Sequence, residues 1–192
     1  MRLLRRRPLI LAAVLLAGAA GGVAVGSPAM AADLCYNHFP TITITSAGTY
    51  NGTSGNDIVV IKHTSGTVTY NPVGGSDEIC RLGDAPLTVR TSGTMSAGNG
   101  HKISIGGYAP ATIYGSNGPD KVGTGGGNDI IIGNGGDDVL EGFGGDDYIA
   151  GNGGNDYIVD HSGNNCLAGG SGQDQIYATG TGHNIILLGY EQ

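Results

Sequence analysis

The sequence lacks the signatures of two common classes of hydrolase. None of its five histidines lies in an H-E-x-x-H zinc motif, and no serine lies in G-x-S-x-G, to which Ser171 comes closest without the second glycine. The sixteen acidic residues include no pair that stands out for glycoside chemistry. No segment combines a helical period of apolar residues with capping signals. We therefore expect an all-β chain that is not an enzyme.

Basic residues are scarce, and their distribution is uneven. Four of the nine Lys and Arg residues, all arginines, lie in residues 1–31, and the remaining chain carries five against sixteen acids, a net charge near −11. Affinity for nucleic acid comes largely from Lys and Arg on phosphates, so this balance argues against a nucleic-acid partner. It favours a cation as the ligand.

What the sequence has instead is a nine-residue repeat between residues 115 and 177. A carboxylate or amide recurs at every ninth position, at Asp120, Asp129, Asp138, Asp147, Asp156, Asn165 and Asp174. A glycine stands two residues before each of them, and an aliphatic residue two residues after, as in Gly136, Asp138 and Leu140. Three properties kept in phase over seven units indicate a structural repeat.

The period of nine has a physical interpretation. The first six residues of each unit are too rich in glycine for a regular element and suit a turn with positive φ values. The last three suit a short strand with one inward aliphatic side chain. One unit cannot bury that side chain alone, whereas stacked units can do so between two sheets. A Gly/Asp-rich disordered linker is the alternative, but a linker has no reason to keep the aliphatic residue in phase.

These units resemble the RTX, or hemolysin-type, calcium-binding nonapeptide G-G-x-G-x-D-x-U-x. Residues 142–150 and 151–159 match it well, except that Phe143 and Asn152 replace the second glycine. The resemblance implies a parallel β-roll, a β-solenoid in which two nonapeptides make one turn. It also implies Ca²⁺ between neighbouring turns, held by turn carbonyls and by aspartates eighteen residues apart. The metal ligands so implied are Asp120, Asp129, Asp138, Asp147, Asp156, Asn165 and Asp174.

An eighteen-residue turn sorts the repeats into two rows. We expect the first row to hold Lys102, Asp120, Asp138, Asp156 and Asp174, and the second to hold Ala111, Asp129, Asp147, Asn165 and His183. The first row then offers three good calcium sites and the second one or two. The outward positions of the second row include Ile130, Ile132 and Tyr148, and an apolar face of this kind tends to mark a contact surface. We expect it to be covered by the N-terminal half, another copy or a cell-wall component.

We expect four segments along the chain. Residues 1–31 have the arginines, apolar run and A-x-A site of a signal peptide, with either secretory or twin-arginine export. Residues 32–114 form an irregular N-terminal β region of degenerate rungs or a cap; a small separate β-sandwich is the alternative. Residues 115–177 are the calcium-binding array, and residues 178–192 a C-terminal cap.

The chain has three cysteines, Cys35, Cys80 and Cys166. Export makes a disulfide plausible, and the odd number leaves one cysteine over. Cys35 with Cys80 is the preferred pair, and the Cys166 side chain should face outward because it precedes the inward Leu167. The alternative is that all three stay reduced.

Taken together, the sequence predicts a secreted, extracellular calcium-binding β-roll whose folding depends on Ca²⁺ and whose role is structural or adhesive at the cell surface or matrix. Two other functions stay open. A β-helix carbohydrate-active enzyme would show clustered carboxylates in a groove of the N-terminal half. An ice- or surface-binding protein would show regular outward threonine ladders, of which Thr41, Thr43 and Thr45 form only one rung.

Overall fold

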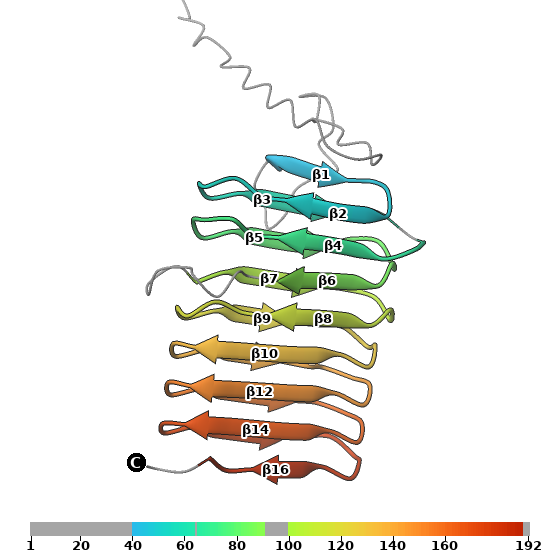
Figure 1. Ribbon diagram of the computed structural model, residues 1–192. Coiled ribbons are helices and arrows are strands. Elements are labelled where there is room, and N and C mark those ends of the chain that lie inside the picture. Colours follow the sequence, from blue (N-terminus) through green and yellow to red (C-terminus); the bar gives the residue numbers. More distant parts are fainter. Residues whose placement is uncertain (1–39, 64, 91–99, 190–192) are drawn as a thin grey trace, which may run out of the picture.

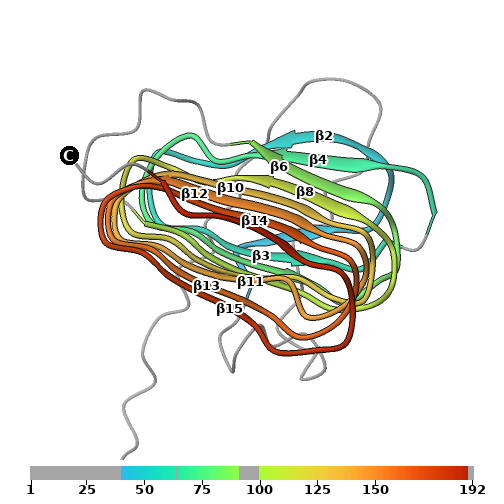
Figure 2. The same cartoon turned by 90° about the horizontal axis from the view of Figure 1, so that it is seen from below.

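A computed structural model describes residues 40–63, 65–90 and 100–189. These residues form a single stack of parallel strands that coils from β1 at the N-terminal end to β16 at the C-terminal end (Figure 1). Seen along the stack, the coil is a flattened ring with one sheet on each long side (Figure 2). The described residues contain strands and turns but no helix. The fold is therefore the predicted parallel β-solenoid.

Two eight-stranded parallel sheets make up the coil, and the chain alternates between them. The odd sheet consists of β1 (Ile42–Ile44), β3 (Ile58–Ile61), β5 (Glu78–Arg81), β7 (Lys102–Ile105), β9 (Lys121–Gly123), β11 (Val139–Glu141), β13 (Tyr157–Asp160) and β15 (Gln175–Ala178). The even sheet consists of β2 (Gly48–Asn51), β4 (Val68–Asn71), β6 (Leu87–Arg90), β8 (Ala111–Tyr114), β10 (Ile130–Gly135), β12 (Tyr148–Gly153), β14 (Cys166–Ser171) and β16 (Ile185–Leu187).

The strand register confirms the eighteen-residue turn in the array. Lys121, Val139, Tyr157 and Gln175 are consecutive partners in the odd sheet, and Ile130, Tyr148 and Cys166 in the even sheet. Outside the array the step changes, because Glu78 pairs with Lys102 and Thr88 with Thr112. The strands therefore keep their stacking although the number of residues between them varies.

The core is a column of aliphatic side chains between the two sheets. The aliphatic residue of each nonapeptide points inward, and those from Val122 to Leu167 are buried as predicted. Only the last of them, Ile176, is half-buried, because it lies in β15, the final strand of the odd sheet. Tyr70 and Leu87 continue the same core into the N-terminal rungs.

The N-terminal strands belong to the same two sheets as the array. β1 to β8 pair rung by rung and lead directly into β9 and β10. A separate β-sandwich would have sheets of its own, so this alternative is wrong. The irregularity of the N-terminal half lies in its turns.

The outer face of the even sheet is exposed over the array. Ile130 and Tyr148 are each 42% exposed. The N-terminal strands extend the same sheets along the stack and do not pack against the outer face of the array. The described part of the N-terminal half therefore does not cover the face. Coverage by another copy or by a wall component stays a prediction.

Two further predictions concern the termini and the cysteines. Cys80 is disulfide-bonded, and Cys166 is a half-buried free thiol on the outer side of β14. The predicted partner Cys35 and the predicted signal peptide at 1–31 lie outside the described residues. Among the residues that the structure describes, no helix is long and apolar enough to span a membrane.

Candidate calcium-binding edges

Aspartate side chains hold the rungs together at both edges of the solenoid. The first edge comprises the turns that lead from the even to the odd sheet, and the second edge those that lead back. At the first edge the N–H of Asp120 donates to Oδ1 of Asp138 over 2.7 Å, and the N–H of Asp138 donates to Oδ1 of Asp156 over 2.9 Å. At the second edge the N–H of Asp129 donates to Oδ1 of Asp147 over 2.8 Å. Each aspartate therefore clamps the preceding turn.

The ladders correct two row assignments made from the nine-residue period. His101, not Lys102, precedes Asp120, because its N–H donates to Oδ1 of Asp120. Asn184, not His183, follows Asn165, whose N–H donates to the Asn184 side chain. The rungs there are nineteen residues long, so a strict period misplaces them by one position.

The first ladder also extends further toward the N-terminus than predicted. The N–H of Asp57 donates to Oδ1 of Asp77, and the N–H of Asp77 donates to Nδ1 of His101. The spacings of 20 and 24 residues hide this continuation from a search for a period of nine. The local signal is the Asn56-Asp57-Ile58 sequence, which resembles the regular units.

The second carboxylate oxygen of most array aspartates is buried and has no hydrogen-bond partner. This holds for Oδ2 of Asp129, Asp138, Asp147 and Asp156. Each of the last three oxygens fills the space that a side chain on the first glycine of its own turn would need, as at Gly133 beside Asp138. Burying an unpartnered carboxylate oxygen is unfavourable, so these oxygens are candidate ligands for a cation.

Backbone conformation separates open turns from closed ones. In an open turn, the second and fourth residues both have positive φ, and these pairs are Asn134 with Gly136, Phe143 with Gly145, Asn152 with Gly154, and Gly170 with Gly172. Asparagine tolerates this region, whereas a bulky Phe143 at φ 69 is a strained exception. The residues that replace the second glycine of the motif therefore keep the positive φ that glycine would adopt there. Three open turns stack at the first edge, and residues 142–147 form one at the second.

The turn of Asp120 is closed: it lacks the two positive φ values, and its own residue Ser116 hydrogen-bonds the second oxygen of the aspartate. The N–H of Ser116 donates to Oδ2 of Asp120 over 2.6 Å, and the Ser116 hydroxyl lies 3.2 Å from the same oxygen. Thr53 makes the equivalent bonds to Oδ2 of Asp57. Because these oxygens already have donors, Asp120 and Asp57 are poorer metal ligands than the aspartates of the open turns.

Burial controls the protonation of the open-turn carboxyls in the metal-free fold. Desolvation raises the pKa of Asp138 to about 8 and that of Asp156 to about 6, and neighbouring carboxylates add to both shifts. Backbone N–H donors oppose the shifts without cancelling them. A bound cation would favour the ionised form, so these carboxyls are suited to a divalent metal.

Protein groups occupy the corresponding positions in the N-terminal turns. At the first edge, the Tyr70 hydroxyl donates to Oδ2 of Asp77 over 3.2 Å and lies 3.5 Å from Oδ2 of Asp57. At the second edge, the buried Arg81 guanidinium donates to the carbonyls of Ala85, Gly106 and Ala109 over 2.7–2.9 Å. The positively charged Arg81 side chain thus binds turn carbonyls in the rungs that precede the array.

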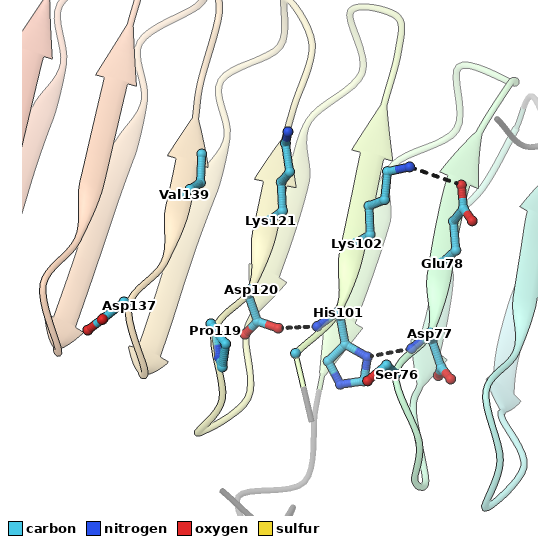
Figure 3. A pocket seen from close by; sticks show the side chains of 11 residues that line it. Ser76, Asp77, Glu78, His101, Lys102, Pro119, Asp120, Lys121, Asp137 and Val139 are labelled. Carbon is cyan, nitrogen blue, oxygen red and sulfur yellow. Dashed lines mark hydrogen bonds and ion pairs between the residues drawn. The ribbon is translucent and has the colours of Figure 1, made fainter. Parts of the chain in front are cut away.

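A shallow pocket lies on the odd-sheet side of the first edge (Figure 3). Its acidic side chains are already engaged: Asp120 accepts from the His101 N–H, and Glu78 pairs with Lys102 over 3.4 Å. The imidazole of His101 accepts from the Asp77 N–H, and burial lowers its pKa. These groups bind one another across three rungs and so connect neighbouring rungs of the stack.

The described residues contain no cluster of three or more His, Cys, Asp or Glu side chains that could hold a metal. Metal at the open turns would therefore need backbone carbonyls beside the aspartates, as hard oxygen ligands for Ca²⁺.

Parallel sheets joined by turns of this kind define the class of β-roll proteins. A family model described as the RTX calcium-binding nonapeptide repeat (4 copies) matches residues 105–140, 123–158 and 141–176. Residues 105–176 are RTX calcium-binding nonapeptide repeats. No curated protein and no solved structure matches the chain.

Proposed function

We propose that this chain is a secreted calcium-binding β-roll whose array folds when it binds Ca²⁺. The observation that carries the proposal is the stack of three open turns at the first edge, in which Asp138 and Asp156 are buried and Asp174 is half-buried. Asp138, Asp156 and Asp174 are the principal ligands there, and Asp147 is the principal ligand at the second edge. Asp120, Asp129 and Asn165 border these sites and contribute less, because their turns lack the open conformation.

Calcium dependence follows from the composition of the array. Ten acids and one lysine lie between residues 115 and 177, and repulsion among them opposes compaction without a cation. Ordering the glycine-rich turns costs much backbone entropy, and each nonapeptide buries only one aliphatic side chain in return. Metal binding supplies the difference, so its free energy becomes folding free energy.

The test is circular dichroism and calcium titration calorimetry on the chain that begins at Ala32. We expect a largely unfolded array after calcium removal and a β spectrum at millimolar Ca²⁺, the range typical of extracellular modules. Magnesium at the same concentration is the control for ionic strength and divalent charge. A β spectrum that is unchanged by calcium, with no heat of binding, would refute the proposal.

The extracellular setting supports a structural or adhesive role. A signal peptide at residues 1–31 would export the chain from the low calcium of the cytosol to a calcium-rich exterior. The array would then fold after export, which favours the secretory route over twin-arginine export of folded cargo. The exposed face with Ile130, Ile132 and Tyr148 is the proposed contact surface for another copy or a wall component.

One observation favours a second candidate function, binding to ice or another regular surface. Four threonines align in consecutive rungs on the outer face of the even sheet: Thr49, Thr69, Thr88 and Thr112. Their spacing is that of parallel strands, about 4.8 Å. The ladder ends at Ile130, so it belongs to the N-terminal rungs alone. Thermal hysteresis of the folded protein, lost on Thr69→Tyr and Thr88→Tyr substitution, would support this function.

A further inference from the structure

Asp160 departs from the repeat at the position where its turn should begin with glycine. Its strand partners are Ala178 on one side and, by the same register, Gly142 on the other. An inward carboxylate here is unusual, because the corresponding glycines in the neighbouring turns leave that space to the ladder aspartate. Asp160 is nevertheless only 1% exposed, so it lies within the second edge.

Two unpartnered carboxylate oxygens meet beside Gly142. A side chain on Gly142 would collide with Oδ2 of both Asp147 and Asp160. Neither oxygen has a hydrogen-bond partner, and Asp147 is 2% exposed. Within the described chain, neither carboxylate forms an ion pair with Lys or Arg. Two buried negative groups that converge in this way repel each other unless a proton or a cation lies between them.

The other oxygen of Asp160 is fixed in place. Oδ1 accepts from the Asn165 side-chain amide over 2.6 Å and from the Ser162 N–H over 3.0 Å. Asn165 stands where the regular repeat has aspartate, and its own oxygen accepts the ladder bond from the Asp147 N–H over 2.8 Å. Asn165 thus keeps the ladder and orients Asp160, while the negative charge has moved to Asp160.

We propose that Asp147 and Asp160 together form an off-pattern Ca²⁺ site at the second edge, with Asp160 supplying the carboxylate that Asn165 lacks. This deepens the proposed calcium-binding function and rests on it. The gap between the turns at 142–147 and 160–165 then contains two carboxylates, as many as a gap between two regular aspartates. Ligand charge is a main determinant of calcium affinity, so Asp160 makes this site stronger than Asp147 with Asn165 alone would be.

The test is calcium titration calorimetry on the chain from Ala32, comparing wild type with Asp160→Asn. Asparagine keeps the shape and the Oδ1 acceptor but removes the charge. We expect the loss of one calcium equivalent, or a dissociation constant raised roughly tenfold or more at one site. Asp146→Asn is the matched control: Asp146 is exposed in the adjacent turn and accepts from the Asn164 N–H, and its substitution should leave the stoichiometry unchanged.

The second variant moves the negative charge from position 160 to position 165. Asp160→Asn combined with Asn165→Asp places the carboxylate at the regular ladder position, and we expect it to recover the lost equivalent even if the single variant folds poorly. Hydrogen exchange of residues 142–165, with and without Ca²⁺, shows whether the change is local. If wild type binds calcium and Asp160→Asn binds it equally, this site is refuted and the pair shares a proton instead. If wild type binds no calcium, the proposed function itself fails.

Discussion

The N–H of Asp138 donates a 2.9 Å hydrogen bond to Oδ1 of Asp156, one rung further along the first edge. The same Asp156 side chain keeps Oδ2 buried and unpartnered. One oxygen therefore clamps the neighbouring turn, and the other is available to a metal. Substitution by asparagine separates these roles, because the amide oxygen can still accept the clamp while the negative charge is lost.

The first prediction compares aspartates of open and closed turns. Asp156 lies between the open turns of Asp138 and Asp174, so Asp156→Asn should weaken two calcium sites. Asp174→Asn should weaken one, because no further open turn follows it. Asp120→Asn should have the smallest effect, since Ser116 already satisfies Oδ2 of Asp120. Calcium stoichiometry by calorimetry is the measurement, and equal losses for Asp120→Asn and Asp156→Asn would contradict the distinction.

The second prediction concerns pH in the absence of calcium. The folded-state pKa is about 8 for Asp138 and about 6 for Asp156, both raised above the unfolded value near 3.8 mainly by burial. Raised values mean that the folded array binds protons more tightly than the unfolded chain. Their contribution to stability is fully present below pH 3.8 and is lost as the pH rises through 6 to 8.

Circular dichroism of calcium-stripped protein between pH 4 and pH 9 measures this dependence. We expect the β signal of the array to be largest at pH 4 and to be lost as the pH rises. At saturating Ca²⁺ the signal should instead increase with pH, because protons compete with the metal. Asp138→Asn should flatten the metal-free dependence. A metal-free β signal that increases with pH would show that these carboxyls are ionised in the fold.

The third prediction is that the N-terminal rungs fold without calcium. Arg81 is 2% exposed, and its guanidinium donates to carbonyls of two successive turns, those of Ala85 and of Gly106 and Ala109. Arg81→Met leaves these carbonyls without donors and should lower the free energy of unfolding by about 3 kcal/mol. Arg81→Lys should recover only part of the loss, because one ammonium group cannot reproduce the planar fork of donors.

Hydrogen exchange over β3 to β6 is the measurement for these variants. In wild type, these strands should stay protected after calcium removal while β11 to β15 become exposed. Arg81→Met should expose β3 to β6 whether or not calcium is present. Full protection of the variant at saturating Ca²⁺ would instead mean that the array holds the N-terminal rungs in place.

The sequence predicts the solenoid because three residue types repeat together in the array. Asp138, its preceding Gly136 and its following Leu140 each have one fixed role in the fold: the hydrogen bond between rungs, the turn and the core. The spacing of the N-terminal rungs is not predictable in this way, since turns can lengthen without disturbing strand pairing. A strict period of nine therefore predicts Lys102 where the structure has His101, and a longer last rung does the same at His183 and Asn184. The Asp57–Asp77 continuation cannot be found from this period.

The chemistry of the edges required the structure. The division between open and closed turns depends on φ at the second residue of the turn. Asn134 and Phe143 adopt a left-handed conformation there, which their residue types do not predict as a glycine would. Asp160 shares no phase with the other aspartates, so no period identifies it. Arg81 lies at an inward strand position, where a sequence pattern predicts an apolar side chain.

The last prediction concerns the exposed outer face of the even sheet. Ile130 is 42% exposed and lies in one column with Tyr148, Cys166 and Ile185, all at outward positions of successive rungs. A contiguous apolar column of this kind favours association, so Ile130→Glu should weaken self-association or binding to cell-wall material by introducing a charge at its upper end. Val139→Glu is the matched control, because Val139 is 38% exposed at an outward position of the opposite sheet. Sedimentation velocity at millimolar Ca²⁺ and a wall-fraction pull-down measure the two forms of contact. Equal behaviour of Ile130→Glu, Val139→Glu and wild type in both assays would show that this face has no partner of either kind.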